Sequence, residues 1–210
     1  MNRIARRALH TSAVPTDLAS VTHRDEAGEK PELAGVSPEV VEAIWHSVER
    51  LYRTGVHPGI QLSVRHRGEQ ILHRAIGHAS GNGPHDAVDA LKVPMTTETP
   101  ICYFSASKAV TALLIHILAE QGLVNLMDPV SYYCPAFAGG GKLLCEAKPV
   151  EVDGAKVAYH AITGGFVLQR VLEKVTGDTI EAYIDRHLRK PMGMKWFTYG
   201  IAPADVDKLA

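Results

Sequence analysis

Two side chains that together can activate a hydroxyl lie one helical turn apart in the segment FSASK, residues 104–108. Ser105 and Lys108 are three residues apart, a spacing that places them on one face of a helix with Cβ atoms about 5–6 Å apart. A serine hydroxyl is a weak nucleophile until a base takes its proton, and a lysine can be that base if burial lowers its pKa. Because the N–H groups at a helix start favour developing negative charge, the pattern indicates a nucleophile with its base.

The same residues also have a structural explanation, and the sequence leaves both open. Ser105 or Ser107 can cap the helix that follows, while Lys108 extends into solvent. Nine serines and ten lysines in 210 residues give about 0.4 chance matches to this spacing. A Ser-x-x-Lys match alone is therefore weak evidence for a catalytic pair. Ser105 is nevertheless the only serine in the chain with a lysine three residues later.

The segment after Lys108 predicts the helix that positions this pair. Residues 109–118 are apolar nearly all round, and a helix of that kind belongs in a protein interior. Gly122 is expected to end the helix, and His116 within it is interpreted as a core histidine rather than a metal ligand. The pair would then stand at the start of the most buried helix in the chain.

A further helix and a β-hairpin are predicted before this segment. Residues 35–55 predict a helix that begins at the N-cap residue Ser37 and carries an apolar stripe at helical spacing. Ile60, Leu62 and Val64 alternate with polar residues, and after the turn candidate HRGE the segment QILHRAI, residues 70–76, is expected to return as a second strand. This pattern is typical of two antiparallel strands joined by a tight turn.

Two later helices are expected, over residues 162–177 and over residues 178–191. The first carries aliphatic side chains at positions i, i+3, i+4 and i+7. The second opens with Asp178 and Glu181 in capping-box spacing, which predicts Asp178 as its cap.

The order of these elements predicts an α+β fold, an antiparallel sheet with a helical lobe, and not alternating β and α units. Two strands make a poor sheet, so weak strands are expected in residues 140–160 and 195–210 unless part of the fold is missing. Residues 1–35 are polar and interrupted by prolines, which predicts a loose N-terminal leader. Residues 36–210 would then form one partial domain.

Composition and charge argue against nucleic-acid-binding and membrane-spanning functions. The chain is 46% hydrophobic and 21% charged with a net charge of -1, which gives no basic footprint for nucleic acid. The sequence contains no run of 18 apolar residues, so no membrane span is expected. Three cysteines without zinc spacing (Cys102, Cys134 and Cys145) favour a reducing, cytoplasmic compartment and no metal. The first 16 residues, with three arginines and no acid, suit a frayed basic terminus or a transit peptide. The oligomeric state stays open.

Several blocks occur in an order that is familiar from one family. They are SASK at 105–108, EQG at 120–122, LMDPV at 126–130, PAF at 135–137, YHA at 159–161 and PMGM at 191–194. In this order they resemble the motifs of the serine β-lactamase-like family, which includes class C β-lactamases, DD-peptidases and family VIII carboxylesterases. The resemblance covers roughly residues 36–200 and implies the β-lactamase/transpeptidase-like fold.

The resemblance implies roles for three residues. Ser105 would be the acylated nucleophile, Lys108 would share or accept its proton, and Tyr159 would lie opposite as base or proton shuttle. The backbone N–H of Ser105 would supply half of an oxyanion hole. The resemblance implies a small-molecule ester or amide substrate and no cofactor.

Three departures from the family pattern bear on activity. Ala161 stands where β-lactamases usually have an asparagine, which favours ester hydrolysis over lactam hydrolysis. Only 21 residues separate Phe137 from Tyr159, where relatives have a longer segment. The family's late Lys-Thr-Gly-like motif does not occur after residue 160, although KVTG at 174–177 has a related spelling.

Two hypotheses from different classes follow. In the first, the chain is a serine hydrolase that cleaves small carboxylic esters through an acyl-enzyme on Ser105. In the second, it is a shortened, catalytically inactive relative that acts as a binding scaffold or is a gene remnant. Residues Ser105, Lys108 and Tyr159 favour the first, and the missing late motif favours the second.

Overall fold

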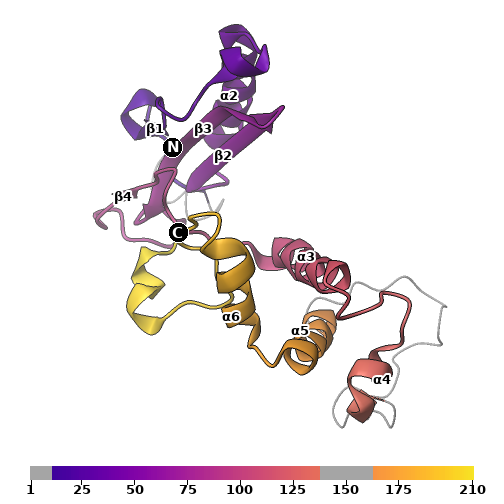
Figure 1. Cartoon of the computed structure of the whole chain (residues 1–210). Helices are drawn as coiled ribbons and strands as arrows, with labels where there is room; N and C mark the ends of the chain where they lie inside the picture. Colours follow the sequence, from indigo (N-terminus) through magenta and orange to yellow (C-terminus); the bar gives the residue numbers. More distant parts are fainter. Residues whose placement is uncertain (1–10, 138–162) are drawn as a thin grey trace, which may run out of the picture. The chain divides into compact units, whose positions relative to one another are not determined.

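The computed structural model describes residues 11–137 and 163–210 of the chain. The chain divides into two compact units (Figure 1). Unit 1 comprises Met1–Cys102 and Pro203–Ala210, and unit 2 comprises Tyr103–Ala202. Unit 1 holds the sheet, and unit 2 holds the helices that carry the candidate site.

Unit 1 is built on an antiparallel hairpin. Strands β2 (Gly59–His66) and β3 (Glu69–Ser80) pair along their lengths, as the sequence predicts. Arg67 and Gly68 join them with positive φ angles of 51° and 86°, the backbone that a two-residue hairpin turn requires. The hairpin therefore forms from its local turn chemistry and its alternating pattern.

Two short strands complete this sheet. Strand β1 (Thr22–Arg24) pairs with β3 on the side opposite β2, which gives the order β1-β3-β2. Strand β4 (Val93–Pro94) pairs with the end of β3. Neither strand is long enough to show a hydrophobic period, so the sequence pattern does not reveal them. The α+β fold class and the antiparallel sheet are confirmed.

Helix α2 (Pro38–Arg53) packs its apolar stripe on the sheet (Figure 1). Its bounds agree with the helix that the sequence predicts, although the Ser37 side chain at the N-cap position accepts no capping hydrogen bond. The core between α2 and the strands buries two aromatic and several aliphatic side chains: Leu18, Val41, Trp45, Val48, Tyr52, Leu72 and Ile76.

The structure differs from the expected loose leader over residues 18–34. Helical turns η1 (Ala19–Val21) and η2 (Pro31–Ala34) flank β1. Backbone N–H groups of Asp25 and Lys30 donate to carbonyls of β3. Pairing with the distant strand β3 orders this segment. A sequence pattern of neighbouring residues does not reveal such pairing.

Unit 2 is helical. Its elements in chain order are η3 (Phe104–Ala106), α3 (Ser107–Glu120), α4 (Val130–Tyr133), η4 (Pro135–Phe137), α5 (Thr163–Thr176), α6 (Ile180–Ile184) and a π-helical turn η5 (Asp185–Arg189). Its core joins α3, α5 and α6 through buried side chains that include Leu114, Leu118, Leu172 and Tyr183. This core fixes the helices around the candidate site.

Helix α3 is not buried all round, so that expectation is wrong. Thr111, Leu114 and Leu118 are buried on the side of the unit 2 core, whereas Leu113 is 47% exposed. His116 is also exposed and is not a core histidine. Within the described residues, the helices of unit 2 cover one face of α3, and an apolar sequence does not say how many faces are covered.

Two further expectations need correction. The cap of α6 is Thr179, whose Oγ1 accepts from the Ala182 N–H, while Asp178 pairs with Arg186 instead. Residues 195–210 contain no strand, and Pro203–Lys208 forms the helical turn η6. The other expected strands, in residues 140–160, lie outside the described residues.

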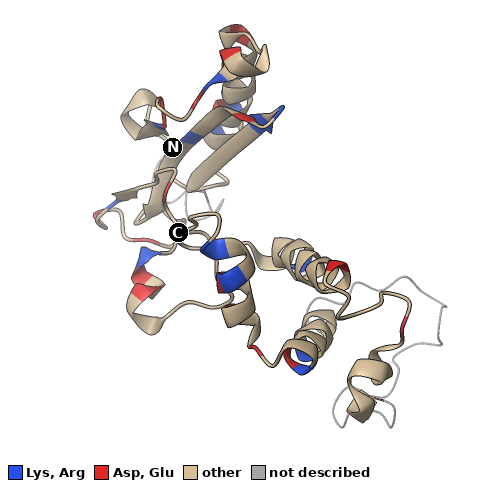
Figure 2. Ribbon diagram, viewed as in Figure 1, with Lys and Arg blue, Asp and Glu red and all other residues tan. Residues whose placement is uncertain are grey.

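Charged side chains of both signs are interspersed along the elements of each unit (Figure 2). Many form local ion pairs, such as Arg170 with Glu173 and Arg189 with Asp185. Across residues 11–137 and 163–210, no helix is both long enough and apolar enough to cross a membrane.

Candidate active site

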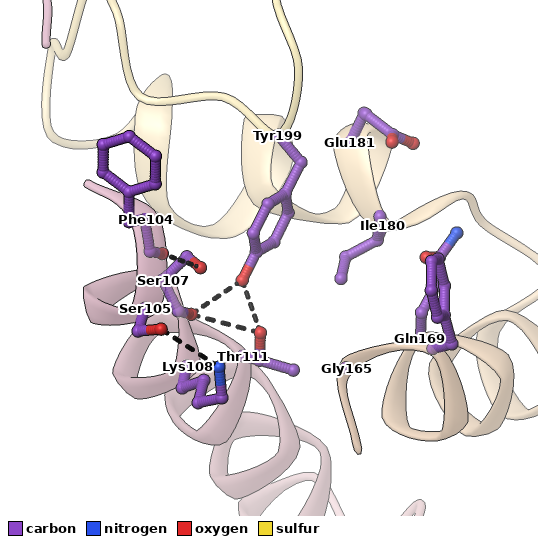
Figure 3. Close-up of a pocket in the computed structure, with 11 residues that line it drawn as sticks. Phe104, Ser105, Ser107, Lys108, Thr111, Gly165, Gln169, Ile180, Glu181 and Tyr199 are labelled. Atoms are coloured by element: carbon purple, nitrogen blue, oxygen red, sulfur yellow. Dashed lines mark hydrogen bonds between the residues drawn. The ribbon is translucent and has the colours of Figure 1, made fainter. Parts of the chain in front are cut away.

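Ser105 and Lys108 lie together where η3 runs into α3. Ser105 belongs to the η3 turn and Lys108 to the first turn of α3. The Lys108 Nζ lies 3.4 Å from the Ser105 Oγ, within reach of a long hydrogen bond (Figure 3). Hydrogen bonds of catalytic groups are often long in ligand-free proteins and shorten when substrate binds. The contact therefore fits a nucleophile beside its base.

Backbone strain precedes the serine directly. Phe104 has a φ angle of +44°, a conformation that side-chain-bearing residues rarely adopt and that costs about 1–3 kcal/mol. The Ser107 Oγ donates a 2.6 Å hydrogen bond to the Phe104 carbonyl oxygen. Because such strain persists only where surrounding contacts maintain it, the turn that carries Ser105 is held in place.

The capping alternative for these serines does not describe this geometry. Ala106 occupies the N-cap position of α3 and makes no side-chain cap. The Ser107 hydroxyl acts as a donor to a carbonyl, whereas a cap accepts from an N–H group. The Ser105 hydroxyl is contacted by Lys108. Of the two explanations, the paired one agrees with the contacts.

Ser105 and Lys108 line a pocket of about 500 Å³. Helices α3, α5 and α6 and the segment after η5 contribute to its wall (Figure 3). Its lining residues are Phe104, Ser105, Ser107, Lys108, Thr111, Gly165, Phe166, Gln169, Ile180, Glu181 and Tyr199. A pocket with apolar walls and a few polar groups is the usual form of a small-molecule site.

Two exposed aromatic side chains stand out in this wall. Phe104 is 82% exposed and Phe166 is 62% exposed, and both line the pocket. Burying such apolar surface under a ligand would contribute about 25 cal/mol per Å². Among the described residues, the ionisable acid and amine of the wall are Glu181 and Lys108. These features suit a largely apolar small molecule.

Tyr199 is a pocket residue that the sequence reasoning missed. Its hydroxyl donates to the Ser107 carbonyl oxygen at 2.9 Å and contacts the Thr111 Oγ1 (Figure 3). It lies outside the helices and 92 positions after Ser107, so no local spacing connects it to the site. The sequence signal closest to it is the PMGM block a few residues earlier.

The third residue of the expected site, Tyr159, lies outside the described residues, as does Ala161. Ser105 and Lys108 are therefore the two expected site residues whose geometry can be given. Among residues 11–137 and 163–210, no group of three His, Cys, Asp or Glu side chains is arranged to hold a metal ion.

Comparisons with known proteins agree with one another. The family model described as Beta-lactamase matches residues 47–210. The Esterase/beta-lactamase LipL of Mycobacterium tuberculosis is 29% identical over 147 residues, which cover 54% of this chain and 34% of LipL. PbpX of Bacillus subtilis is 28% identical over 118 residues, which cover 43% of this chain and 30% of PbpX. This chain thus matches about a third of each relative.

One solved structure has the same fold. A penicillin-binding protein homolog from Caulobacter crescentus superposes with a TM-score of 0.67 at 23% sequence identity. The superposition covers 84% of this chain and 54% of the homolog.

Proposed function

This chain belongs to the β-lactamase family, and on that premise we propose that it is a serine hydrolase that cleaves small carboxylic esters through an acyl-enzyme on Ser105. The observation that carries the proposal is the contact between the Lys108 Nζ and the Ser105 Oγ at the mouth of a pocket. Family membership supports the class of hydrolase. The residue roles and the ester substrate are the finer parts of the proposal.

The first half of the reaction forms the acyl-enzyme. Lys108 in its neutral form accepts the proton of the Ser105 hydroxyl, and the Oγ attacks the ester carbonyl carbon. The bond between this carbon and the alcohol oxygen then breaks, and the alcohol leaves with the proton that Lys108 returns. The Ser105 backbone N–H at the start of the helical segment would stabilise the developing oxyanion.

The second half releases the acid. Water gives a proton to the base, attacks the acyl carbon and displaces the Ser105 Oγ, which takes the proton back. Tyr159, by the family resemblance, would assist as base or proton shuttle in both halves. A phenol has a pKa of about 10, so Tyr159 acts as the base only if Lys108 is protonated beside it and is not itself the base.

An ester is the favoured substrate for two reasons. Ala161 stands where β-lactamases usually carry an asparagine, and an alanine offers no amide to the side chain of a lactam. The exposed Phe104 and Phe166 provide apolar surface for an acyl group. The name of the relative LipL includes esterase, which is consistent with this choice.

The sparse cysteines favour a reducing compartment such as the cytoplasm.

A second candidate function is binding without turnover. The proposed site has one named oxyanion donor, the backbone N–H of Ser105. Loss of one oxyanion donor typically costs about 10²–10³ in rate. A pocket that binds esters and acylates slowly would then act as a scaffold.

Intact-mass analysis of the purified chain separates these candidates. The protein is incubated with a fluorophosphonate and, separately, with p-nitrophenyl butyrate. We expect one phosphonyl adduct and ester turnover, both lost in Ser105→Ala. Ser131→Ala is the matched control, since Ser131 on α4 does not line the pocket. No adduct on a well-folded protein would contradict the hydrolase and leave the scaffold.

A further inference from the structure

We infer that Tyr199 and Thr111 are positioning residues that hold the turn carrying Ser105 and Lys108 in its reactive shape. They act through the carbonyl group of Ser107, which lies between the two candidate catalytic residues in the sequence. The inference rests on the proposed function and goes beyond it, because it assigns a role to two residues that lie outside the family motifs.

Three polar contacts converge at this point. The Ser107 carbonyl oxygen is 2.9 Å from the Tyr199 hydroxyl and 3.2 Å from the Thr111 Oγ1, and the two hydroxyls are in hydrogen-bond contact with each other. Two hydroxyls carry only two hydrogens, so two of the three contacts can be hydrogen bonds at one time. The two shorter contacts are both hydrogen bonds when the Thr111 hydroxyl donates to the Tyr199 oxygen and the Tyr199 hydroxyl donates to the Ser107 carbonyl oxygen.

The network continues to the other side of Ser105. Ser107 uses its own Oγ to donate to the carbonyl oxygen of Phe104, the residue with the positive φ angle. Phe104 and Ser107 lie on either side of Ser105 in the sequence, and the two sets of hydrogen bonds meet at Ser107, one at its carbonyl oxygen and one at its Oγ. A strained turn keeps its conformation only when its surroundings determine it, and this network is such a determinant.

Burial makes the network rigid. Thr111 is only 8% exposed, and Tyr199 packs against the hydrophobic core of unit 2. Removing one hydroxyl therefore breaks a hydrogen bond between packed side chains at the pocket wall. Figure 3 shows the Tyr199 hydroxyl directed at Ser107 and Thr111. The described contacts join Tyr199 to the turn and not to the Ser105 hydroxyl, so its role is positioning.

The test measures the rate of Ser105 phosphonylation, as kinact/KI for a fluorophosphonate, in Tyr199→Phe, Thr111→Val and the double variant. We expect each single substitution to lower this rate about tenfold, as the loss of one buried hydrogen bond allows. The double variant should be no slower than the slower single variant, because both remove the same network. Thr111→Ser, which keeps the hydroxyl, should restore most of the rate.

Tyr132→Phe is the matched control, because this exposed tyrosine on α4 does not line the pocket. Hydrogen–deuterium exchange over residues 104–112 reports the turn directly, and the thermal midpoint reports folding. We expect faster exchange there in Tyr199→Phe, with the ring still packed and the midpoint little changed. Wild-type labelling rate and wild-type exchange in Tyr199→Phe would overturn the inference.

The two proposals fail in different ways. A wild-type chain that takes no label contradicts the proposed hydrolase, and the exchange measurement then decides the inference alone. Faster exchange over residues 104–112 in Tyr199→Phe would support the network as the determinant of the turn. Unchanged exchange would overturn it.

Discussion

The two units treat their aromatic and charged side chains in opposite ways. In unit 1 both aromatic residues, Trp45 and Tyr52, are buried, and a charged side chain, Arg74, is buried with them. Among the described residues of unit 2, four aromatic side chains are exposed, and two of these, Phe104 and Phe166, line the pocket. Apolar surface left open beside polar reactive groups is typical of a binding site.

The buried charged cluster of unit 1 contributes to stability, whereas the exposed groups of unit 2 belong to the candidate site. Arg74 on β3 lies beneath α2, with its guanidinium 5.6 Å from the Trp45 ring centre. It donates to Glu29 through two nitrogens, each at 2.8 Å, and to Glu42 at 3.1 Å. Every charge in this cluster has a partner, so the cluster holds β3 and α2 together without leaving reactive groups open. Unit 2 instead keeps the Ser105 hydroxyl and its strained turn accessible.

The largest expected effect comes from Arg74→Met. This substitution leaves the Glu29 carboxylate, whose side chain is 11% exposed, without its cation. Removing one partner of a buried ion pair typically costs about 3–5 kcal/mol of unfolding free energy. We expect denaturant unfolding to show a loss of this size, while the labelling rate of Ser105 in the folded protein stays at the wild-type value.

Arg24→Met provides the matched control for this prediction. Arg24 also pairs with Glu42, but the side chains of both are 41% exposed. An exposed pair contributes about 0–1 kcal/mol. If Arg74→Met cost no more than Arg24→Met, the buried cluster would not be what stabilises unit 1, and the comparison between the units would fail.

The next effect is a loss of stability in acid that depends on Glu42. The hydrogen bond from Arg74 lowers the pKa of Glu42 below its ordinary value of 4.5. A carboxyl group whose pKa is lower in the folded state contributes stability above its unfolded pKa, and this contribution is lost as the pH falls through the folded pKa. We therefore expect the free energy of unfolding to decrease below about pH 4.5.

Glu42→Gln tests the source of this acid sensitivity. The variant should be less stable than wild type at pH 7 and should show a shallower fall in acid. Asp185→Asn is the comparison in unit 2, where the hydrogen bond from Arg189 lowers the pKa of Asp185. That pair lies within one helical segment and its arginine is 27% exposed, whereas Arg74 is 2% exposed, so its removal should flatten the pH dependence less. An equal or larger flattening in Asp185→Asn would contradict the contrast.

Local pattern was enough to predict the elements that form from their own residues. The helix expected over residues 35–55 and the hairpin over 57–81 are present, because an apolar stripe and a tight turn are properties of neighbouring residues. The proximity of Ser105 and Lys108 follows from the same kind of argument, since three-residue spacing brings side chains together on any helical segment.

Features that depend on distant contacts could not be predicted in this way. Strand β1 pairs with β3, and the buried ion pairs of Arg74 join β3 to Glu29 and to Glu42 of α2, residues far from it in the sequence. Tyr199 reaches Thr111 across 88 positions, so no spacing rule includes it. Helix α3 was expected to be buried because it is apolar, yet the number of packed faces is decided by its neighbours.

The smallest expected effect concerns that exposed face of α3. Leu113 is 47% exposed, whereas its neighbour Leu114 is fully buried in the unit 2 core. Glutamine has nearly the helix propensity of leucine, so Leu113→Gln should change the free energy of unfolding by no more than about 0.5 kcal/mol. Leu114→Ala, by contrast, should cost about 2–5 kcal/mol through the cavity it leaves. Denaturant unfolding of both variants measures the difference. A loss in Leu113→Gln that approached that of Leu114→Ala would mean that α3 has a second covered face, and unit 2 would then be as closed as unit 1.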